Sequence, residues 1–335
     1  MREVTPSGGF LSGSWTSIRD IWAHRQLWWR LTRRELKARY KDSVLGYVWT
    51  LIRPLVNLLI YYLAIGKVLA AERAIPDFAV YVFAGLTAWT LFSQTITSAT
   101  SSILANAGIV KKVYLPREIF PLAATGSAVI DFLSQLVILF CGALLIRGID
   151  TTAMFLYAPI SLCVVLAWGV AIGLILSAVN VYLRDVQYLV EVGVLIGFWL
   201  TPCVYSYAQL AGQAPQFITD VYLYNPMALA VMGFQKAFWV QGQYAQWPVH
   251  LLTKLGIMFL IGIVLVFIAA VFLIVRLSLA PAALMLENTG VVEGIGRSWA
   301  LTRGSFWRVL GILVLAGLIT GLVTGTLSFG LGMVF

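Results

Sequence analysis

Residues 27–49 read LWWRLTRRELKARYKDSVLGYVW, a basic and aromatic segment that runs directly into an apolar stretch. On a helical wheel of about 100° per residue, one arc of about 120° holds bulky side chains and the opposite arc holds basic ones. The first arc carries Trp28, Trp29, Thr32, Leu36 and Tyr40, and the second carries Arg30, Arg33, Arg34, Lys37 and Lys41. Such a helix is typical of one that lies flat among lipid headgroups. The segment therefore predicts where a membrane domain begins.

Arg39 is the exception, because it falls within the apolar arc of this helix. A charge in that position must either snorkel out to lipid phosphates or meet an anionic group at the membrane surface. The residues alone leave both alternatives open.

The composition of the whole chain points to lipid as its solvent. Of the 335 residues, 60% are hydrophobic and 11% are charged, whereas soluble proteins have about 25% charged residues. The mean hydropathy is +0.89. These values predict an all-α polytopic membrane protein. The net charge of +9 is spread between apolar runs that interfacial aromatics accompany, which argues against a nucleic-acid partner.

Apolar runs long enough to cross a bilayer, which takes about 20 residues, set the expected domain organisation. Six spans are expected at 47–70, 78–104, 122–146, 154–183, 189–207 and 249–275, with a seventh candidate at 309–335. Residues 1–46 then form a tail with the amphipathic helix, 47–276 a six-span domain, and 277–335 a linker with the extra span. Nine of the 23 Lys and Arg residues precede the first span, which predicts a cytoplasmic N-terminus.

The sequence offers no converging catalytic or metal-binding residues. Its two histidines, His24 and His250, fall on opposite predicted sides of the membrane, and its three cysteines lack C-x-x-C spacing. It also lacks a G-x-x-x-x-G-K-[ST] loop, so ATP cannot bind through a P-loop. We therefore expect no catalytic residue, metal or cofactor in this chain, and ATP-driven transport would need a separate ATPase.

Two charges lie within apolar runs, where they are costly. Arg53 either snorkels to the membrane surface or lines a hydrated pathway, and Asp131 either pairs with a neighbouring helix or faces a hydrated cavity. The spacings Gly169-x3-Gly173 and Gly193-x3-Gly197 are interpreted as helix packing positions.

Two connecting segments are candidates for functional roles. The short charged loop 106–118 is either a basic turn that fixes topology or a helix that docks into a partner. The 43-residue segment 206–248 is too interrupted to span, yet it contains an apolar stretch at 226–239. It is expected to be re-entrant or interfacial. Its glutamines and aromatics suit sugar rings, although the same mixture marks any membrane interface.

Six blocks of the sequence, taken in order, resemble type-2 ABC transporter permeases that export polysaccharides. They are RYKDSVLGYVW (39–49) with Pro54, GLTAWTLFS (85–93), Asn106 with VKKVYLPRE (110–118), NVYLRDV (180–186), TPCVYS (201–206) and NPM (225–227). The resemblance implies a six-span homodimer in the bacterial inner membrane, with two ATPase subunits that bind ATP and Mg. It also implies that a polyprenyl-linked glycan, such as an O-antigen or a teichoic acid, moves outward between the permeases.

The resemblance also implies roles for particular residues. Substrate entrance is assigned to Arg39 and Tyr40, with Arg39 meeting the pyrophosphate of the lipid-linked glycan. ATPase coupling is assigned to Asn106, Lys111, Lys112, Tyr114, Pro116 and Arg117. Channel-lining candidates are Tyr61, Trp89, Phe92 and Trp199, and the external gate is assigned to Tyr205, Asn225 and Pro226.

Two alternatives stay open at this point. One is a type-2 permease for a small drug or lipid, and the other is a scaffold or secondary transporter without an ATPase. Residues 277–335 depart from the family, whose members usually stop soon after the sixth span. This tail resembles a fragment of another multi-spanning membrane protein and is assigned no function.

Overall fold

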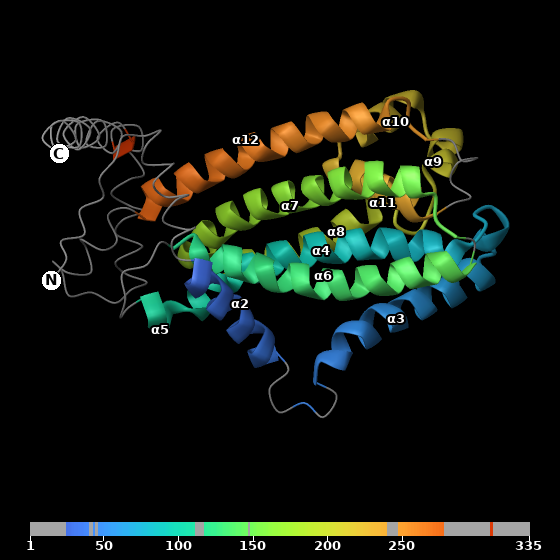
Figure 1. Cartoon of the computed structure of the whole chain (residues 1–335). Coiled ribbons are helices and arrows are strands. Elements are labelled where there is room, and N and C mark those ends of the chain that lie inside the picture. The colour runs from blue at the N-terminus through green and yellow to red at the C-terminus, as the bar shows by residue number, and fades with distance from the viewer. Residues whose placement is uncertain are drawn as a thin grey trace, which may run out of the picture.

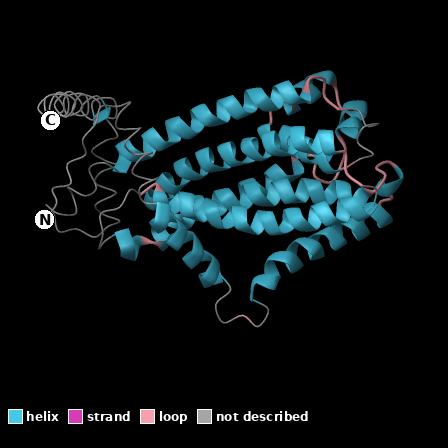
Figure 2. Cartoon of the chain, viewed as in Figure 1, coloured by secondary structure: helices cyan, strands magenta, loops and turns pink. Residues whose placement is uncertain are grey.

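The computed structural model describes residues 25–39, 43, 46–110, 117–146, 148–239, 247–277 and 309–310. Within these residues every regular element is a helix and no strand occurs (Figure 2). Several of the helices are long and apolar enough to cross a bilayer. The expectation of an all-α polytopic membrane protein is confirmed.

The elements follow the chain in a simple order. They are α2 (Arg25–Arg39), η1 (Gly46–Val48), α3 (Trp49–Tyr61), η2 (Tyr62–Val68), η3 (Ala71–Arg73), α4 (Phe78–Ala105), α5 (Ala107–Val110), α6 (Ile119–Ile146), α7 (Thr151–Tyr182), α8 (Val186–Trp199), α9 (Tyr207–Gln213), α10 (Gln216–Tyr222), α11 (Pro226–Phe238) and α12 (Leu251–Leu277). In the described part of the chain, five helical stretches are long enough to span a bilayer: Gly46–Val68, Phe78–Ile109, Ile119–Ile146, Thr151–Tyr182 and Leu251–Leu273. They correspond to the first, second, third, fourth and sixth predicted spans.

The fifth predicted span, 189–207, is wrong in its extent. Helix α8 has only 14 residues and ends at Trp199, which gives it a length of about 21 Å. The chain then forms a buried turn at 201–204. Pro202 explains the stop, because proline lacks a backbone N–H and disfavours helical backbone at the residue before it, here Thr201.

Four long helices, α4, α6, α7 and α12, run side by side, while α2 and α3 diverge on one side of α6 (Figure 1). The end of this bundle where α4 ends and α6 begins is called the α5 end. The opposite end carries α9 and α10 and is called the α10 end. Most of α4 is buried by its neighbours, whereas α3 is largely exposed.

Glycines on α7 allow that helix to lie close to α4. A Cβ on Gly173 would lie 2.8 Å from the Cβ of Ala99, and one on Gly169 would lie 3.2 Å from the Cγ2 of Thr95. The packing interpretation of this pair is confirmed. On α8, a Cβ on Gly197 would lie 2.8 Å from the Trp89 ring, whereas Gly193 has no described atom within 4 Å of that position. Of the second pair, only Gly197 therefore lies at a helix–helix contact, and the packing interpretation does not hold for Gly193 within the described residues.

We predict that Gly173→Ala destabilises the protein while Gly193→Ala does not. The new methyl at position 173 meets Ala99, whose Cβ is fixed to its backbone, so the two helices must move apart; such overpacking costs about 1–3 kcal/mol. At position 193 the methyl enters open space and gains up to about 1 kcal/mol of helix propensity. Thermal unfolding in detergent measures both, and equal melting temperatures for the two variants would contradict the close contact.

The apolar stretch of the external segment forms α11, and it is buried inside the bundle. Asn225 caps its N-terminus by accepting hydrogen bonds from the backbone N–H groups of Met227 and Ala228 at 3.0 and 3.3 Å. At its other end, the Trp239 indole donates to the carbonyl of Pro76, just before α4, at 2.8 Å. Because α11 is covered by α4 and α7, the structure favours the re-entrant alternative over the interfacial one. The seventh candidate span lies almost entirely outside the described residues.

Candidate functional site

The amphipathic helix α2 docks onto α6 near the α5 end. The Trp28 indole donates to the carbonyl of Leu122 at 3.0 Å, and the Thr32 hydroxyl donates to the carbonyl of Ala123 at 3.3 Å. Gly126 makes this close approach possible, since a Cβ there would lie 2.8 Å from the Thr32 hydroxyl and 2.9 Å from the Trp28 ring. One face of α2 is thus held by protein.

The docked face of α2 overlaps the predicted bulky arc at Trp28 and Thr32 but differs from it in part. Leu31 and Thr32 are the buried residues of the helix, whereas Trp29 is 51% exposed. The physical reason is that the hydrogen-bonding partners and the space above Gly126 select the face, rather than side-chain bulk alone. The basic arc is exposed as predicted, at Arg30, Arg33, Arg34 and Lys37.

Arg39, the exception on the apolar arc, forms an ion pair with Asp131. Its Nη1 lies 2.7 Å from Oδ2 of Asp131, and its Nη2 donates to the hydroxyls of Ser98 and Ser127, each at 3.3 Å. The anionic group that Arg39 meets in the structure is therefore a carboxylate of the chain itself. Of the two alternatives for Asp131, the structure shows pairing with a neighbouring helix.

The ion pair is asymmetric. The Arg39 side chain is 34% exposed, whereas that of Asp131 is 3% exposed. Oδ1 of Asp131 is buried and has no hydrogen-bond partner among the described residues. Nearby on α2, burial raises the pKa of Glu35, and the guanidinium groups of Arg39 and Arg34 oppose that rise. Tyr40, the other predicted entrance residue, lies outside the described residues.

Asn106 ties the end of α4 to α2. Its side-chain oxygen accepts a hydrogen bond from Arg34, and its Nδ2 donates to the carbonyl of Ser102 at 2.8 Å. The short helix α5 follows directly. Of the other predicted coupling residues, Arg117 is half-buried just before α6, and Lys111, Lys112, Tyr114 and Pro116 lie outside the described residues. The contact with Arg34 was not foreseen from the sequence.

The four channel candidates lie on α3, α4 and α8. Three of them contact Phe198, a residue that was not predicted from the sequence. Its ring centroid lies 5.6 Å from that of Tyr61, 6.1 Å from that of Trp89 and 5.6 Å from that of Trp199. Phe92 joins through Trp89, with the centroids 5.6 Å apart. Trp199 is 56% exposed, while Trp89, Phe92 and Phe198 are buried. The position of Phe198 beside Trp199 in an apolar run is the signal that could have drawn attention to it.

The three predicted gate residues lie together near the α10 end. The Tyr205 hydroxyl donates to the carbonyl of Trp199 at 3.1 Å and lies 3.2 Å from the hydroxyl of Tyr222. Since the Tyr205 proton goes to that carbonyl, Tyr222 is the donor between the two hydroxyls. Burial raises the pKa of Tyr222 well above its usual range, so this donor keeps its proton.

Asn225 and Pro226 connect the end of α8 to the start of α11. While its oxygen caps α11, Nδ2 of Asn225 donates to the carbonyl of Leu200 at 3.1 Å. Pro226 occupies the first turn of α11, where its missing N–H has no cost. One side chain therefore fixes two helix ends.

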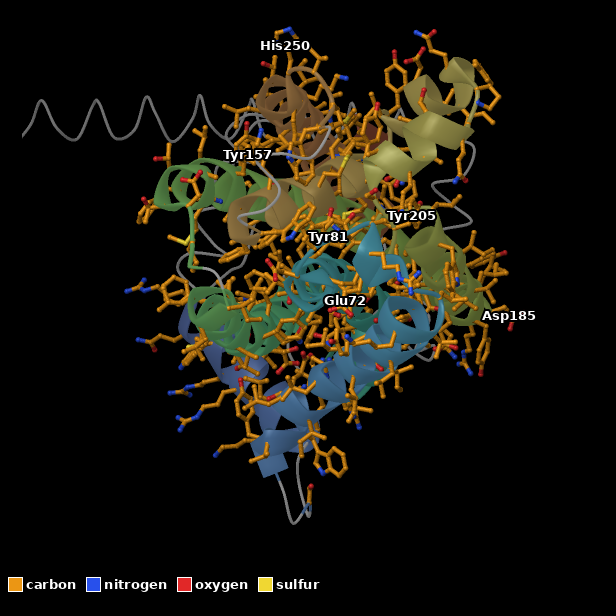
Figure 3. All side chains as sticks on the ribbon, turned by 90° about the vertical axis from the view of Figure 1, so that its right-hand side faces the viewer. Glu72, Tyr81, Tyr157, Asp185, Tyr205 and His250 are labelled. Carbon is orange, nitrogen blue, oxygen red and sulfur yellow. The ribbon has the colours of Figure 1, made fainter. Side chains whose placement is uncertain are left out.

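The buried turn at 201–204 is held by α4 and α11. The Tyr81 hydroxyl donates to the carbonyl of Tyr205 at 2.7 Å, and Nε2 of Gln235 donates to the carbonyl of Pro202 at 2.6 Å. Gly85 leaves room for the turn, because a Cβ there would lie 3.1 Å from the Cα of Cys203. Figure 3 looks onto the α10 end and places Tyr81 near the centre of the bundle, next to Tyr205.

Comparison with known proteins identifies the family. The family model described as "ABC-2 type transporter" matches residues 26–239, which include α2, the aromatic cluster, the gate residues and α11. The chain belongs to this family. As an ABC-2 permease it is a multi-pass transport subunit that works with an ABC ATPase partner in the membrane.

Curated relatives of this ABC-2 permease are named for O-antigen export or for polysialic acid transport. The O-antigen export system permease protein RfbA of Klebsiella pneumoniae is 29% identical over 209 residues, which is 62% of this chain and 78% of the relative. The protein of the same name from Myxococcus xanthus is 28% identical over 222 residues, or 66% and 84% of the two chains. The polysialic acid transport protein KpsM of Escherichia coli is 33% identical over 78 residues, or 23% and 30%.

A second family model overlaps the end of the ABC-2 match. It is described as a domain of unknown function, DUF7847, and it covers residues 216–334. The C-terminal part of this ABC-2 permease therefore has relatives of its own, but they assign no activity to it.

Proposed function

We propose that this chain is the transmembrane subunit of an ATP-driven exporter that moves a polyprenyl-linked polysaccharide out of the cytoplasm. The observation that carries the proposal is the similarity to O-antigen export permeases over more than 200 residues. The exposed ring of Trp199 and the half-buried ring of Tyr61, at the edge of the aromatic cluster, add support, since aromatic faces suit the C–H faces of sugar rings.

The proposed assembly contains two copies of this chain and two ATPase subunits, which bind ATP and Mg. The homodimer is proposed from membership of the ABC-2 family, and the apolar faces that α3 and α8 leave uncovered would meet the second copy or lipid tails. These faces carry Leu55, Val56, Leu59 and Ile60 on α3 with Leu63 on the adjoining η2, and Leu189, Val192, Leu195, Ile196 and Trp199 on α8. The excess of basic residues before α3 supports a cytoplasmic N-terminus in the bacterial inner membrane.

The proposed path begins at Arg39. Its guanidinium is partly exposed, and a planar fork of this kind fits the oxygens of a pyrophosphate. The substrate would compete with Asp131 for Arg39, then pass the aromatic cluster and leave by the gate at Tyr205, Asn225 and Pro226. The loop from Asn106 to Arg117 would receive the motion of the ATPase.

Deletion of the gene in its native host tests the proposal. We expect surface polysaccharide to disappear and polyprenyl-linked glycan to accumulate in the cytoplasm, with both effects reversed by a plasmid copy. A deletion strain with intact surface glycan and no accumulated intermediate would refute the proposal. Drug sensitivity in such a strain would instead favour a permease for small molecules.

A further inference from the structure

One face of α4 carries polar, uncharged side chains over three turns in the half of the helix nearer the α5 end. This polar face consists of Thr90, Ser93, Gln94, Thr97, Ser98 and Ser101, all of which are partly exposed. On a helical wheel the six positions fall within about 140°. Between residues 90 and 101, no apolar residue falls within this arc.

Hydrocarbon does not suit such a face. Polar residues within a membrane-spanning helix face the protein interior or a hydrated cavity, yet these six residues are not fully covered within the chain. The helix itself is the least apolar of the five long ones. The polar face is therefore better suited to contact with water, or with a polar partner that replaces water, than with lipid tails.

Hydroxyl groups on this face donate to backbone carbonyls of α4 itself, so their oxygens can still accept hydrogen bonds. Ser93 donates to the carbonyl of Thr90 at 3.1 Å, Thr97 to that of Ser93 at 2.8 Å, and Ser101 to that of Thr97 at 3.3 Å. Each hydroxyl oxygen still has acceptor capacity, and each proton can turn outward. The face thus offers weak, exchangeable hydrogen bonds rather than one fixed site.

Three further observations connect this face with the proposed substrate path. The Gln94 side chain is partly exposed, and its oxygen is turned inward with no hydrogen-bond partner among the described residues, so this polar side chain is not satisfied within the free chain. Ser98 accepts a hydrogen bond from Arg39, the proposed entrance residue. Four positions before Ser93, Trp89 belongs to the aromatic cluster. The polar face therefore joins the proposed entrance to the aromatic cluster.

We propose that the polar face of α4 is a contact track for the hydroxyl groups of the moving glycan. This proposal rests on the proposed export function and adds the part of the path that binds the sugar chain itself. A glycan presents neutral hydroxyls at every ring, and exchangeable neutral partners allow it to slide without being trapped. The absence of charge among the six residues fits a track for the sugar chain rather than for its pyrophosphate.

Isosteric substitution tests the track. Thr90→Val, Gln94→Met and Thr97→Val together remove three polar groups at nearly constant volume, and we expect glycan export by the intact permease–ATPase complex to fall about tenfold. The matched control combines Thr87→Val and Thr100→Val on the same helix. Those side chains are covered by the protein rather than exposed as the track residues are, and their hydroxyls donate to the carbonyls of Phe83 and Ile96, so export is expected to stay near the unchanged level.

Thiol labelling reports on the track independently of export. In a background with its native cysteines replaced, Ser93→Cys and Ser101→Cys are expected to react with a charged, membrane-impermeant methanethiosulfonate in the assembled complex, and Thr100→Cys is not. Lack of reaction at both track positions, or normal export by the triple variant at normal protein levels, overturns the track. If the deletion strain still displays its glycan, the proposed export function fails instead, so the two failures can be told apart.

Discussion

Arg39→Gln is expected to lower the free energy of unfolding by about 3 kcal/mol, because it leaves the Asp131 carboxylate buried without its partner. The partial exposure of Arg39 keeps this value at the low end of the range for broken buried pairs. Thermal unfolding of the purified protein in detergent measures the loss. Lys37→Gln on the same helix is the matched control, since Lys37 is exposed and its loss should change stability by less than about 0.5 kcal/mol.

The double variant Arg39→Gln and Asp131→Asn separates folding from transport. Two amides replace the two charges, so no unpaired buried charge remains and most of the lost stability is expected to return. If Arg39 also meets the pyrophosphate, glycan export stays low in the double variant although the protein is stable. Recovery of export together with stability would assign Arg39 a structural role alone, and additive losses of stability would contradict the ion pair.

The hydropathy pattern predicted most of the fold because solvation by lipid acts on each helix separately. Five spans appear where the apolar runs lie, and α7 packs through Gly169 and Gly173 as their spacing suggests. The error at α8 has a physical cause. An apolar run does not show where the chain turns inside a bundle, and Pro202 stops the helix while the following residues stay buried.

The candidate site was less accessible from the sequence, because its key contacts join distant residues. Arg39 and Asp131 are separated by 92 positions, so each was recognised as an unusual charge but not as the partner of the other. The ring contacts that Phe198 makes with side chains of α3, α4 and α8 are visible only in the folded structure. The polar face of α4 escaped notice because its polar residues alternate along the chain with the buried apolar ones of the same helix.

Simultaneous Tyr81→Phe and Gln235→Met is expected to loosen the turn at 201–204 and to lower the free energy of unfolding by about 3 kcal/mol. The two side chains donate to the carbonyls of Tyr205 and Pro202, and unsatisfied buried acceptors cost about 1–3 kcal/mol each. Amide hydrogen exchange at 203–206 should accelerate, because the turn then lacks its anchors on α4 and α11. Export should fall as well, since this turn connects α8 to the proposed gate.

The two single variants are expected to differ, and this difference tests the assignment of the anchors. Gln235→Met also removes a buried side-chain oxygen that has no partner among the described residues, which offsets part of its cost. The Tyr81 hydroxyl lies 3.3 Å from the carbonyl of Pro202 and can share its proton with that carbonyl once Gln235 is gone. Tyr81→Phe has no such compensation, so it should lower the free energy of unfolding more than Gln235→Met does. Tyr157→Phe is the matched control, because it loses only a half-buried contact with Lys236 and should leave exchange at 203–206 unchanged. Equal exchange in Tyr81→Phe and Tyr157→Phe would show that Tyr81 does not hold the turn.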